Sequence, residues 1–154
     1  IKGGGKYEIK KVPNKIIFSV PEDATRKSKE RAFNEWYRKD LKRVLANITQ
    51  PIEQKMGISA NEYRVKNMKT KWGTCNIEKR RIWINLQLAK KPIECLEYIV
   101  THELVHLIEK NHTHRFNALV AKYYPAWKDA QKKLEQMPLD YLESEEQLFE
   151  EESN

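Results

Sequence analysis

Polar and apolar side chains alternate loosely through the first twenty residues. Pro13-Asn14 stands in the middle of this stretch, where a hairpin would turn. Such alternation is typical of half-buried strands, and Pro and Asn are common turn residues. The pattern therefore predicts two short strands, whose apolar positions are Ile9, Val12, Ile16, Phe18 and Val20.

Beyond Pro21 the spacing of the apolar residues changes to three or four positions. This spacing is that of an amphipathic helix, and it predicts one long helix starting near Ser28. Proline interrupts helical hydrogen bonding, so we expect Pro51 to kink this helix or to start a second one that stops at Gly57. The apolar positions are Phe33, Tyr37, Leu41, Val44, Ile48 and Ile52, and the opposite face is rich in Lys and Arg.

Two further strands and two further helices are predicted downstream. Residues 63–68 and 81–86 alternate like strands, and with residues 72–75 they are expected to form a hairpin or a meander. Helical periodicity then runs from Pro92 to Ile108 and from His114 to Leu134. Strands that precede helices, rather than alternating with them, predict an α+β domain with a small antiparallel or mixed sheet.

Charge is divided unevenly along the chain. The 154 residues include 29 Lys or Arg and 22 Asp or Glu, but seven of the acids and none of the bases lie in residues 139–154. Residues 1–138 thus carry 29 bases against 15 acids, or +14, and the end carries −7. We expect an N-terminal strand region (1–20), a compact domain (21–137) and an acidic, flexible tail (138–154).

The composition also excludes several classes of protein. A hydrophobic content of 40% rules out disorder of the whole chain, and no apolar run is long enough to cross a membrane. Two cysteines and no visible signal peptide indicate reduced thiols in a cytoplasmic protein. The chain begins at Ile1 without a Met, as expected of a fragment with an upstream region missing.

All four histidines lie between positions 102 and 114, in the string HELVHLIEKNHTH. His102 and His106 are four apart on a predicted helix, so both imidazoles can reach one Zn²⁺. Glu103 falls among apolar helix positions beside them, where a base that activates water is needed. The string therefore predicts a metal site. The alternative is a surface cluster of histidines, because an H-E-x-x-H string also occurs by chance.

A catalytic zinc takes a third protein ligand and leaves one position for water. His112 is the better candidate, because its distance from His106 matches that in the extended HExxHxxGxxH motif. Glu109 replaces the glycine of that motif, and we expect Asn111 to adopt the left-handed conformation that turns the chain back. His114 is the alternative ligand, or else a group near the site.

A second distinctive string is Trp72-Gly73-Thr74-Cys75. Its simplest interpretation is structural, with Trp72 packing on the helices, Gly73 permitting a tight bend and Cys75 filling the core. A direct role for Cys75 as nucleophile or ligand is the alternative. Cys95, one turn before Ile99, is expected to be a packing residue.

Together these strings resemble the YgjP-like family of zinc-dependent metallopeptidases, minimal zincins distantly related to the SprT-like and WLM proteases. The resemblance spans about residues 30–134 and includes Ile84-Asn85-Leu86 and Phe116. It implies that His102, His106 and His112 are the zinc ligands and that Glu103 is the catalytic base. It also implies a strand that pairs with an extended peptide, for which residues 81–86 are our candidate.

Two functions follow as hypotheses. The first is a zinc-dependent hydrolase, most simply a peptidase acting on a peptide or protein substrate, with a transition-state donor drawn from His114, Arg115, Tyr123 or Tyr124. The second is a nucleic-acid-associated module with a structural zinc. The second hypothesis is based on five basic runs with Trp36 and Tyr37 among them, and these runs are Arg26-Lys27, Lys29–Arg31, Arg38-Lys39, Lys42-Arg43 and Lys79–Arg81. A solvated helix face is the alternative interpretation of the same residues. A protease acting on nucleic-acid-bound proteins would combine both hypotheses.

Overall fold

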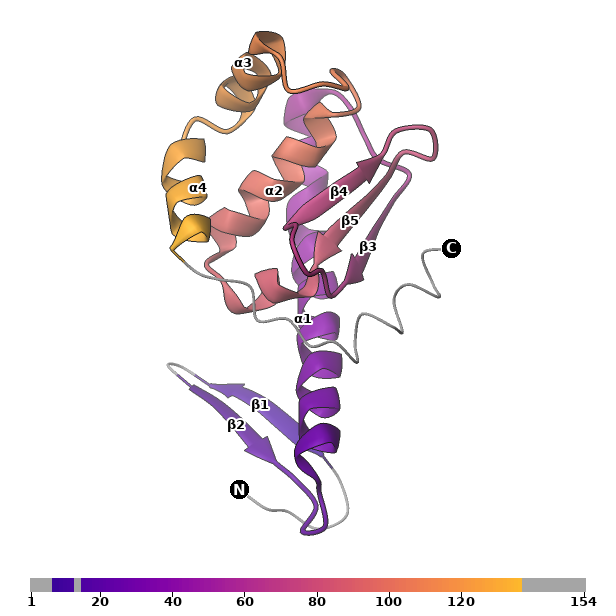
Figure 1. Cartoon of the computed structure of the whole chain (residues 1–154), viewed down its shortest axis with the longest axis vertical. Coiled ribbons are helices and arrows are strands. Elements are labelled where there is room, and N and C mark those ends of the chain that lie inside the picture. The colour runs from indigo at the N-terminus through magenta and orange to yellow at the C-terminus, as the bar shows by residue number, and fades with distance from the viewer. Residues whose placement is uncertain (1–6, 13–14, 137–154) are drawn as a thin grey trace. The chain divides into compact units, whose positions relative to one another are not determined.

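The computed structural model describes residues 7–12 and 15–136, and its fold is α+β, as the sequence predicts (Figure 1). The chain divides into two units, residues 1–40 and 41–154, and the division falls within helix α1 (Arg26–Met56). Each unit is described by itself below. Among the described residues, no helix is both long enough and apolar enough to cross a membrane. The predicted acidic tail lies outside the described part of the chain.

The first unit contains a β-hairpin and the beginning of α1. Strands β1 (Glu8–Val12) and β2 (Lys15–Ser19) pair in antiparallel fashion, with Ile9 opposite Phe18, which confirms the two predicted strands. The Pro13-Asn14 turn lies outside the described residues. The ring of Phe18 packs edge-on against Phe33 of α1, with 3.9 Å between ring centroids. Aromatic packing therefore connects the hairpin to the helix within this unit.

Helix α1 begins and ends with recognisable caps. The Thr25 hydroxyl accepts a hydrogen bond from the Ser28 amide, and the Ser28 hydroxyl accepts one from the Thr25 amide, a reciprocal N-terminal cap. At the other end Gly57 has a φ of 68°, and its amide donates to the Glu53 carbonyl. The helix starts two residues earlier than the sequence predicts.

Pro51 does not start a second helix, so that alternative is wrong, and α1 is a single element of 31 residues. A proline inside a helix removes one hydrogen bond and crowds the preceding turn. Apolar burial on both sides of Pro51 offsets this cost, because Leu45 and Met56 are both buried in the second unit. Packing therefore overrides the local preference for a break.

The second unit contains a mixed three-stranded sheet in the order β3-β5-β4. Strand β4 (Gly73–Asn76) forms an antiparallel hairpin with β5 (Arg81–Asn85), whereas β3 (Glu62–Lys66) pairs with β5 in parallel. The predicted hairpin is confirmed and the meander is wrong. The most apolar strand takes the central position, where its isoleucines, Ile82 and Ile84, are fully buried.

The central position of β5 also overturns the expected docking strand. Both of its edges are occupied, one by β3 and one by β4. Residues 81–86 therefore cannot pair with an extended peptide through β5, contrary to the sequence-based expectation. Within the described part of the chain, the strand next to α2 that keeps an unpaired edge is β4.

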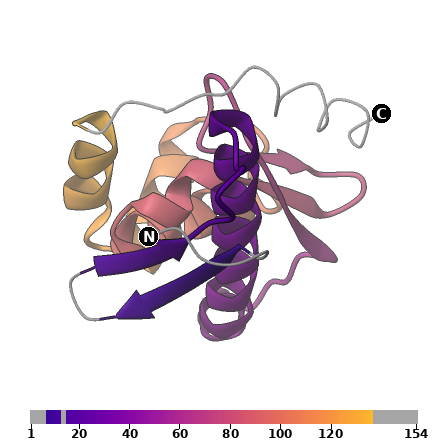
Figure 2. The same ribbon diagram turned by 90° about the horizontal axis from the view of Figure 1, so that it is seen from below.

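Short helices complete the second unit: the 3-10 helix η1 (Leu86–Lys90), α2 (Ile93–Val105), α3 (His114–Tyr123) and α4 (Trp127–Glu135). The single helix expected over residues 114–134 is wrong. Pro125 disfavours helical backbone in the residue before it, and Tyr124 has a φ of −140° and a ψ of 80°. Helix α2 lies between the sheet and α4 (Figures 1 and 2).

Candidate metal centre

Helix α2 and the residue that follows it carry the H-E-x-x-H string. His102 and Glu103 belong to its last turn, and His106 is the capping residue, with a φ of −60° and a ψ of −22°. These angles are helical, so His106 keeps the four-residue relation to His102 although the regular helix ends at Val105. The two imidazoles lie with their ring centroids 5.3 Å apart.

A tight turn after α2 returns the chain toward these rings. The amides of Ile108 and Glu109 both donate to the Val105 carbonyl, which closes the end of the helix. Asn111 is not left-handed, contrary to expectation, because Arg80 is the one described non-glycine residue with a positive φ. The turn is made by hydrogen bonds around the Val105 carbonyl rather than by a special backbone conformation at Asn111.

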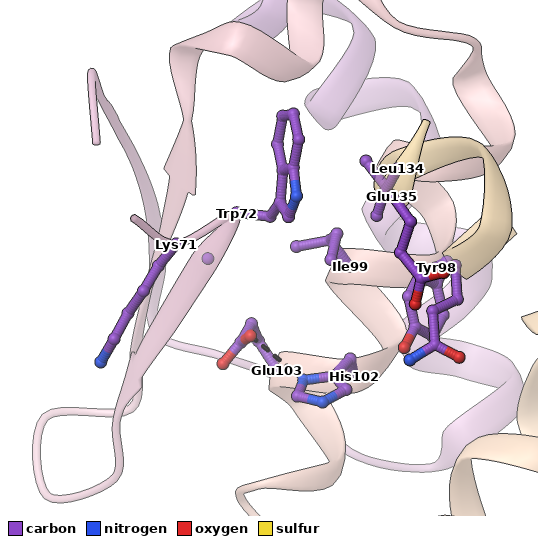
Figure 3. A pocket seen from close by; sticks show the side chains of 10 residues that line it. Lys71, Trp72, Tyr98, Ile99, His102, Glu103, Leu134 and Glu135 are labelled. Carbon is purple, nitrogen blue, oxygen red and sulfur yellow. Dashed lines mark hydrogen bonds and ion pairs between the residues drawn. The ribbon is translucent and has the colours of Figure 1, made fainter. Parts of the chain in front are cut away.

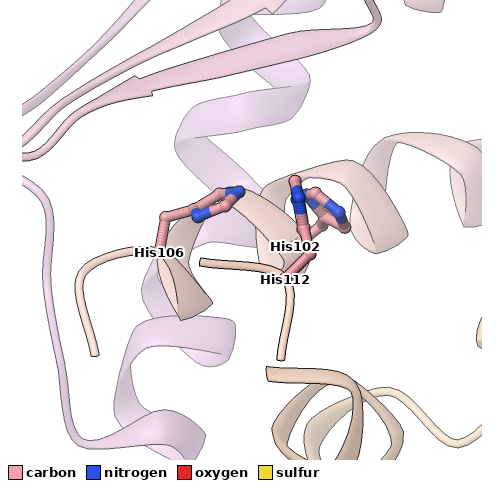
Figure 4. A group of neighbouring side chains, drawn as sticks. All are labelled: His102, His106 and His112. Carbon is pink, nitrogen blue, oxygen red and sulfur yellow. The ribbon is translucent and has the colours of Figure 1, made fainter. Parts of the chain in front are cut away.

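The turn brings His112 beside the other two histidines (Figure 4). Its ring centroid lies 5.4 Å from that of His102 and 4.8 Å from that of His106. One ring nitrogen from each of the three residues falls within 4.8 Å of the others. His114, the alternative ligand, is exposed and does not belong to this group.

The donor set fits a metal ion. Ligand nitrogens on a tetrahedral zinc, each about 2.0–2.1 Å from the metal, are roughly 3.3 Å apart, so small side-chain rotations would bring these three into range. Three neutral imidazoles on one side of a centre are also what catalytic zinc sites use, with the remaining position left for water. His102, His106 and His112 are therefore the residues that could hold a metal.

Hydrogen bonds orient two of the imidazoles. Nδ1 of His106 lies 2.9 Å from the Lys110 carbonyl oxygen, so Nδ1–H donates and Nε2 is left as the potential ligand. Burial lowers the pKa of His106, which favours the neutral, ligating form. Nδ1 of His102 lies 3.2 Å from a Glu103 carboxylate oxygen, and this contact leaves its Nε2 available as well.

A single phenyl ring supports all three histidines. Phe116, on the first turn of α3, is 1% exposed, and its ring centroid lies 4.9 Å from that of His102 and 4.6 Å from that of His106. The corresponding distance to His112 is 4.8 Å. The hydroxyl of Thr113 caps α3 by accepting from the Phe116 amide, which fixes this ring just after the turn. Sequence spacing placed Phe116 on an apolar helix face but could not indicate this contact.

Glu103 lies beside a cavity of about 330 Å³ (Figure 3). The residue is 5% exposed, and its carboxylate faces His102. Trp72 and Ile99 contribute apolar walls to this cavity, and Lys71 and Glu135 contribute charged groups. Tyr98 also lines it, one helical turn before His102. The full lining is Lys71, Trp72, Gly73, Tyr98, Ile99, His102, Glu103, Gln131, Leu134 and Glu135.

The segment that forms one wall of this cavity is held by a buried asparagine. Asn85 is fully buried, and its side-chain amide donates to the carbonyls of Met68 and Lys71. Its backbone amide donates to the Trp72 carbonyl. These bonds tie the connection between β3 and β4 to the central strand, and they explain why a polar residue is tolerated there.

Cys75 lies on β4 and is half-buried; because it is two residues after Gly73, whose Cβ direction points to Ile99 and Glu103, it shares the sheet face turned toward α2. Burial, together with the negative charge of Glu103, raises the pKa of the Cys75 thiol to about 11. The side chain is therefore a neutral thiol near pH 7, which favours the packing interpretation over a nucleophilic thiolate. Cys95 is fully buried, as expected of a packing residue.

The proposed transition-state donors are absent from the lining of the cavity beside Glu103. Arg115 pairs with Glu109 at 3.2 Å, and the Tyr124 hydroxyl donates to the Glu94 carbonyl at 3.2 Å. Tyr98 is the described tyrosine that does line this cavity. Its position four residues before His102 was a signal in the sequence, because residues four apart share a helix face.

Solved structures with a similar fold include two archaeal metallopeptidase zymogens. The metallopeptidase zymogen abylysin of Pyrococcus abyssi matches with a TM-score of 0.54 and 19% identity, covering 58% of this chain and 90% of abylysin. The metallopeptidase zymogen jannalysin of Methanocaldococcus jannaschii matches with a TM-score of 0.53 and 23% identity, covering 60% of this chain and 94% of jannalysin. At these identities the likeness shows a shared minimal metallopeptidase-like fold.

Comparison of sequences gives the family. None of the curated proteins matches the chain significantly. The model of the YgjP-like metallopeptidase domain matches residues 1–137, which is most of the chain and includes every residue of the histidine group. The chain therefore belongs to the YgjP-like metallopeptidase domain family.

Proposed function

We propose that the chain is a zinc-dependent peptidase in which His102, His106 and His112 hold one Zn²⁺ and Glu103 is the general base. The observation that carries this proposal is the convergence of three imidazole nitrogens, within 4.8 Å of one another, beside the buried carboxylate of Glu103. Membership of a metallopeptidase family supports it independently.

In this proposal a bound Zn²⁺ would supply a Lewis acid that polarises the scissile carbonyl and lowers the pKa of water. Glu103 accepts a proton from the attacking water and later delivers it to the departing amine. Its position supports this role, because the carboxylate is nearly buried and lies 3.2 Å from Nδ1 of His102, beside the place where the metal-bound water would be. The His106 contact with the Lys110 carbonyl keeps Nε2 free for the metal.

We further propose that the substrate is an extended peptide paired with the free edge of β4. Main-chain pairing to an edge strand is a common mode of peptide recognition. Strand β4 is favoured because it has an unpaired edge among the described strands and packs against α2, which carries Glu103. A substrate side chain would then enter the cavity formed by Trp72, Ile99 and Leu134.

The test compares three variants for zinc content and for chelator-sensitive cleavage of an unstructured protein such as casein. Glu103→Gln should keep one equivalent of zinc and lose turnover by at least ~100-fold, the usual size of a general-base contribution. His106→Ala should lose zinc and turnover together. His114→Ala is the matched control, because this histidine is exposed and lies outside the group, and it should keep both. Undiminished cleavage by Glu103→Gln would contradict the mechanism.

A further inference from the structure

Strand β4 packs closely against helix α2 at Gly73. A Cβ atom added there would lie 2.8 Å from Cγ2 of Ile99, 3.2 Å from Cγ of Glu103 and 3.2 Å from the Trp83 carbonyl oxygen. The first distance is shorter than real Cβ contacts allow, and the other two are tighter than most. The backbone of Gly73 does not have a positive φ, so conformational freedom is not the reason for a glycine here. The reason is the space between the strand and the helix.

The neighbours of Gly73 differ in how easily they can move. The Trp83 carbonyl belongs to the central strand, which is paired on both sides. Ile99 is β-branched and nearly buried, so its χ1 rotation is restricted. Glu103 has a longer, unbranched side chain, and its carboxylate lies at the cavity. Extra volume at position 73 would therefore be relieved mainly by displacing Glu103.

Strand β4 itself cannot easily withdraw from the helix. The segment before Gly73 is tied down by Asn85, whose side chain binds the Lys71 carbonyl at 2.7 Å. Its backbone amide binds the Trp72 carbonyl at 3.0 Å, and Gly73 then pairs with Ile84 on the central strand. The position of the strand relative to Glu103 is consequently fixed from the side of the sheet.

We propose that Gly73 is a positioning residue for Glu103: its missing side chain lets the β4 backbone pack directly against the Glu103 side chain and hold the carboxylate in its working orientation. This inference rests on the proposed role of Glu103 as the base. It gives the Trp72-Gly73-Thr74-Cys75 string a specific task. The β4 backbone would then both align the substrate and hold Glu103, so a single strand would set the position of the base relative to the substrate.

The experiment uses Gly73→Ala in the full chain. We expect one equivalent of zinc, a KM within about twofold of wild type and a kcat lowered ~10- to 100-fold, because a misplacement of about 1 Å can cost ~100-fold and the crowding at Glu103 calls for a smaller shift. Gly57→Ala is the matched control. Its positive φ of 68° strains any side chain, but a Cβ there meets nothing within 4 Å. This control should lower the Tm and leave kcat unchanged.

A second-site change tests whether crowding is the cause. Ile99→Ala removes the closest obstructing atom, so the double variant Gly73→Ala/Ile99→Ala should differ from Ile99→Ala by less than about threefold in kcat. It also supplies folded protein should the single variant be too unstable. An undiminished 10- to 100-fold loss in the double variant would overturn the proposal.

Crystal structures of wild type and Gly73→Ala, or of the Gly73→Ala/Ile99→Ala and Ile99→Ala pair, separate this inference from the proposed function. A displaced Glu103 carboxylate in Gly73→Ala, closer to its wild-type place in the double variant, supports the positioning role even if no peptide is cleaved. An unmoved carboxylate in Gly73→Ala overturns it whatever the activity. Equal turnover by wild type and Glu103→Gln would instead reject the role of the base.

Discussion

Replacing Phe116 with leucine tests whether the phenyl ring beneath the three histidines prepares them for metal binding. The ring is 1% exposed, and its centroid lies 4.6–4.9 Å from those of all three imidazoles. Leucine keeps the site apolar and retains much of the volume, whereas it removes the aromatic ring that contacts His102 and His112 edge to face and His106 at a tilt. The replacement therefore tests the effect of the phenyl ring on the orientation of the three histidines while the site stays buried and apolar.

The expected cost in stability is modest. A roughly volume-conserving apolar replacement in a core usually costs less than about 1.5 kcal/mol, whereas truncation of a buried phenylalanine to alanine costs about 3–5 kcal/mol. A domain with a typical stability of about 5–15 kcal/mol should stay folded after the leucine replacement. Phe116→Ala would not allow the same conclusion, because its loss of stability would confuse any effect on the metal.

The expected effect on zinc affinity is larger. Residues that orient metal ligands without touching the metal are usually worth 10- to 100-fold in affinity, or about 1.4–2.8 kcal/mol. We expect the lower part of this range for Phe116→Leu, because the Lys110 carbonyl still orients His106. Each imidazole would lose one aromatic contact, of the kind worth about 0.5–1.5 kcal/mol.

Zinc affinity would be measured by competition with a chromophoric chelator, and stability by urea unfolding of the metal-free protein. Val120→Ala is the matched control, since Val120 is buried one turn further along α3 and makes no ring contact with the histidines. It should lower stability by about 1–3 kcal/mol without weakening zinc binding. Wild-type zinc affinity in Phe116→Leu, or an equal loss in Val120→Ala, would refute the reasoning.

Two more predictions concern protonation. Burial lowers the pKa of His106, so the unfolded metal-free chain takes up this proton first as the pH falls. The stability contributed by neutral His106 is therefore complete above the ordinary histidine pKa of about 6.5, and it is lost as the pH falls toward the lower pKa of the folded state. Urea unfolding of the metal-free protein from pH 8 to 5.5 should show this loss of stability. The loss should be smaller in His106→Gln. With a pKa of about 11, the Cys75 thiol should react slowly with iodoacetamide at pH 8 in the native protein and at the normal thiol rate in urea. Cys75→Ser shows which part of the labelling belongs to this residue. Rapid labelling of Cys75 in the native protein would contradict a buried neutral thiol.

Local patterns in the sequence were sufficient for several elements and insufficient for their pairing. Alternation predicted β1 and β2, and the three-and-four spacing predicted most of α1 and α2, because these signals depend on neighbours within a few residues. The parallel pairing of β3 with β5 depends on contacts across the sheet. The sequence therefore gave no reason to place β5 between its neighbours or to leave β4 with the free edge.

The candidate site divides in the same way. The spacing of His102, His106 and His112 can be seen in the sequence alone. The structure brings these three side chains together and leaves His114 outside the group. The contacts of Phe116 and Gly73 depend on how α3 and β4 pack against α2, which no spacing rule describes. The break at Pro125 was readable, but the apolar periodicity on both sides of it outweighed that signal. Nucleic-acid binding by the basic runs stays a prediction of the sequence.

The length of β4 limits what the proposed enzyme could cut. The strand has four residues, and alternate residues of a strand point their amide and carbonyl groups to the same side. A docked peptide would therefore gain about four main-chain hydrogen bonds at most, worth roughly 0.5–1.5 kcal/mol each. So short a platform would hold a peptide weakly and could not pull a strand out of a stable sheet. We expect such an enzyme to act on segments that are already unfolded, and to owe its selectivity to the cavity beside Glu103.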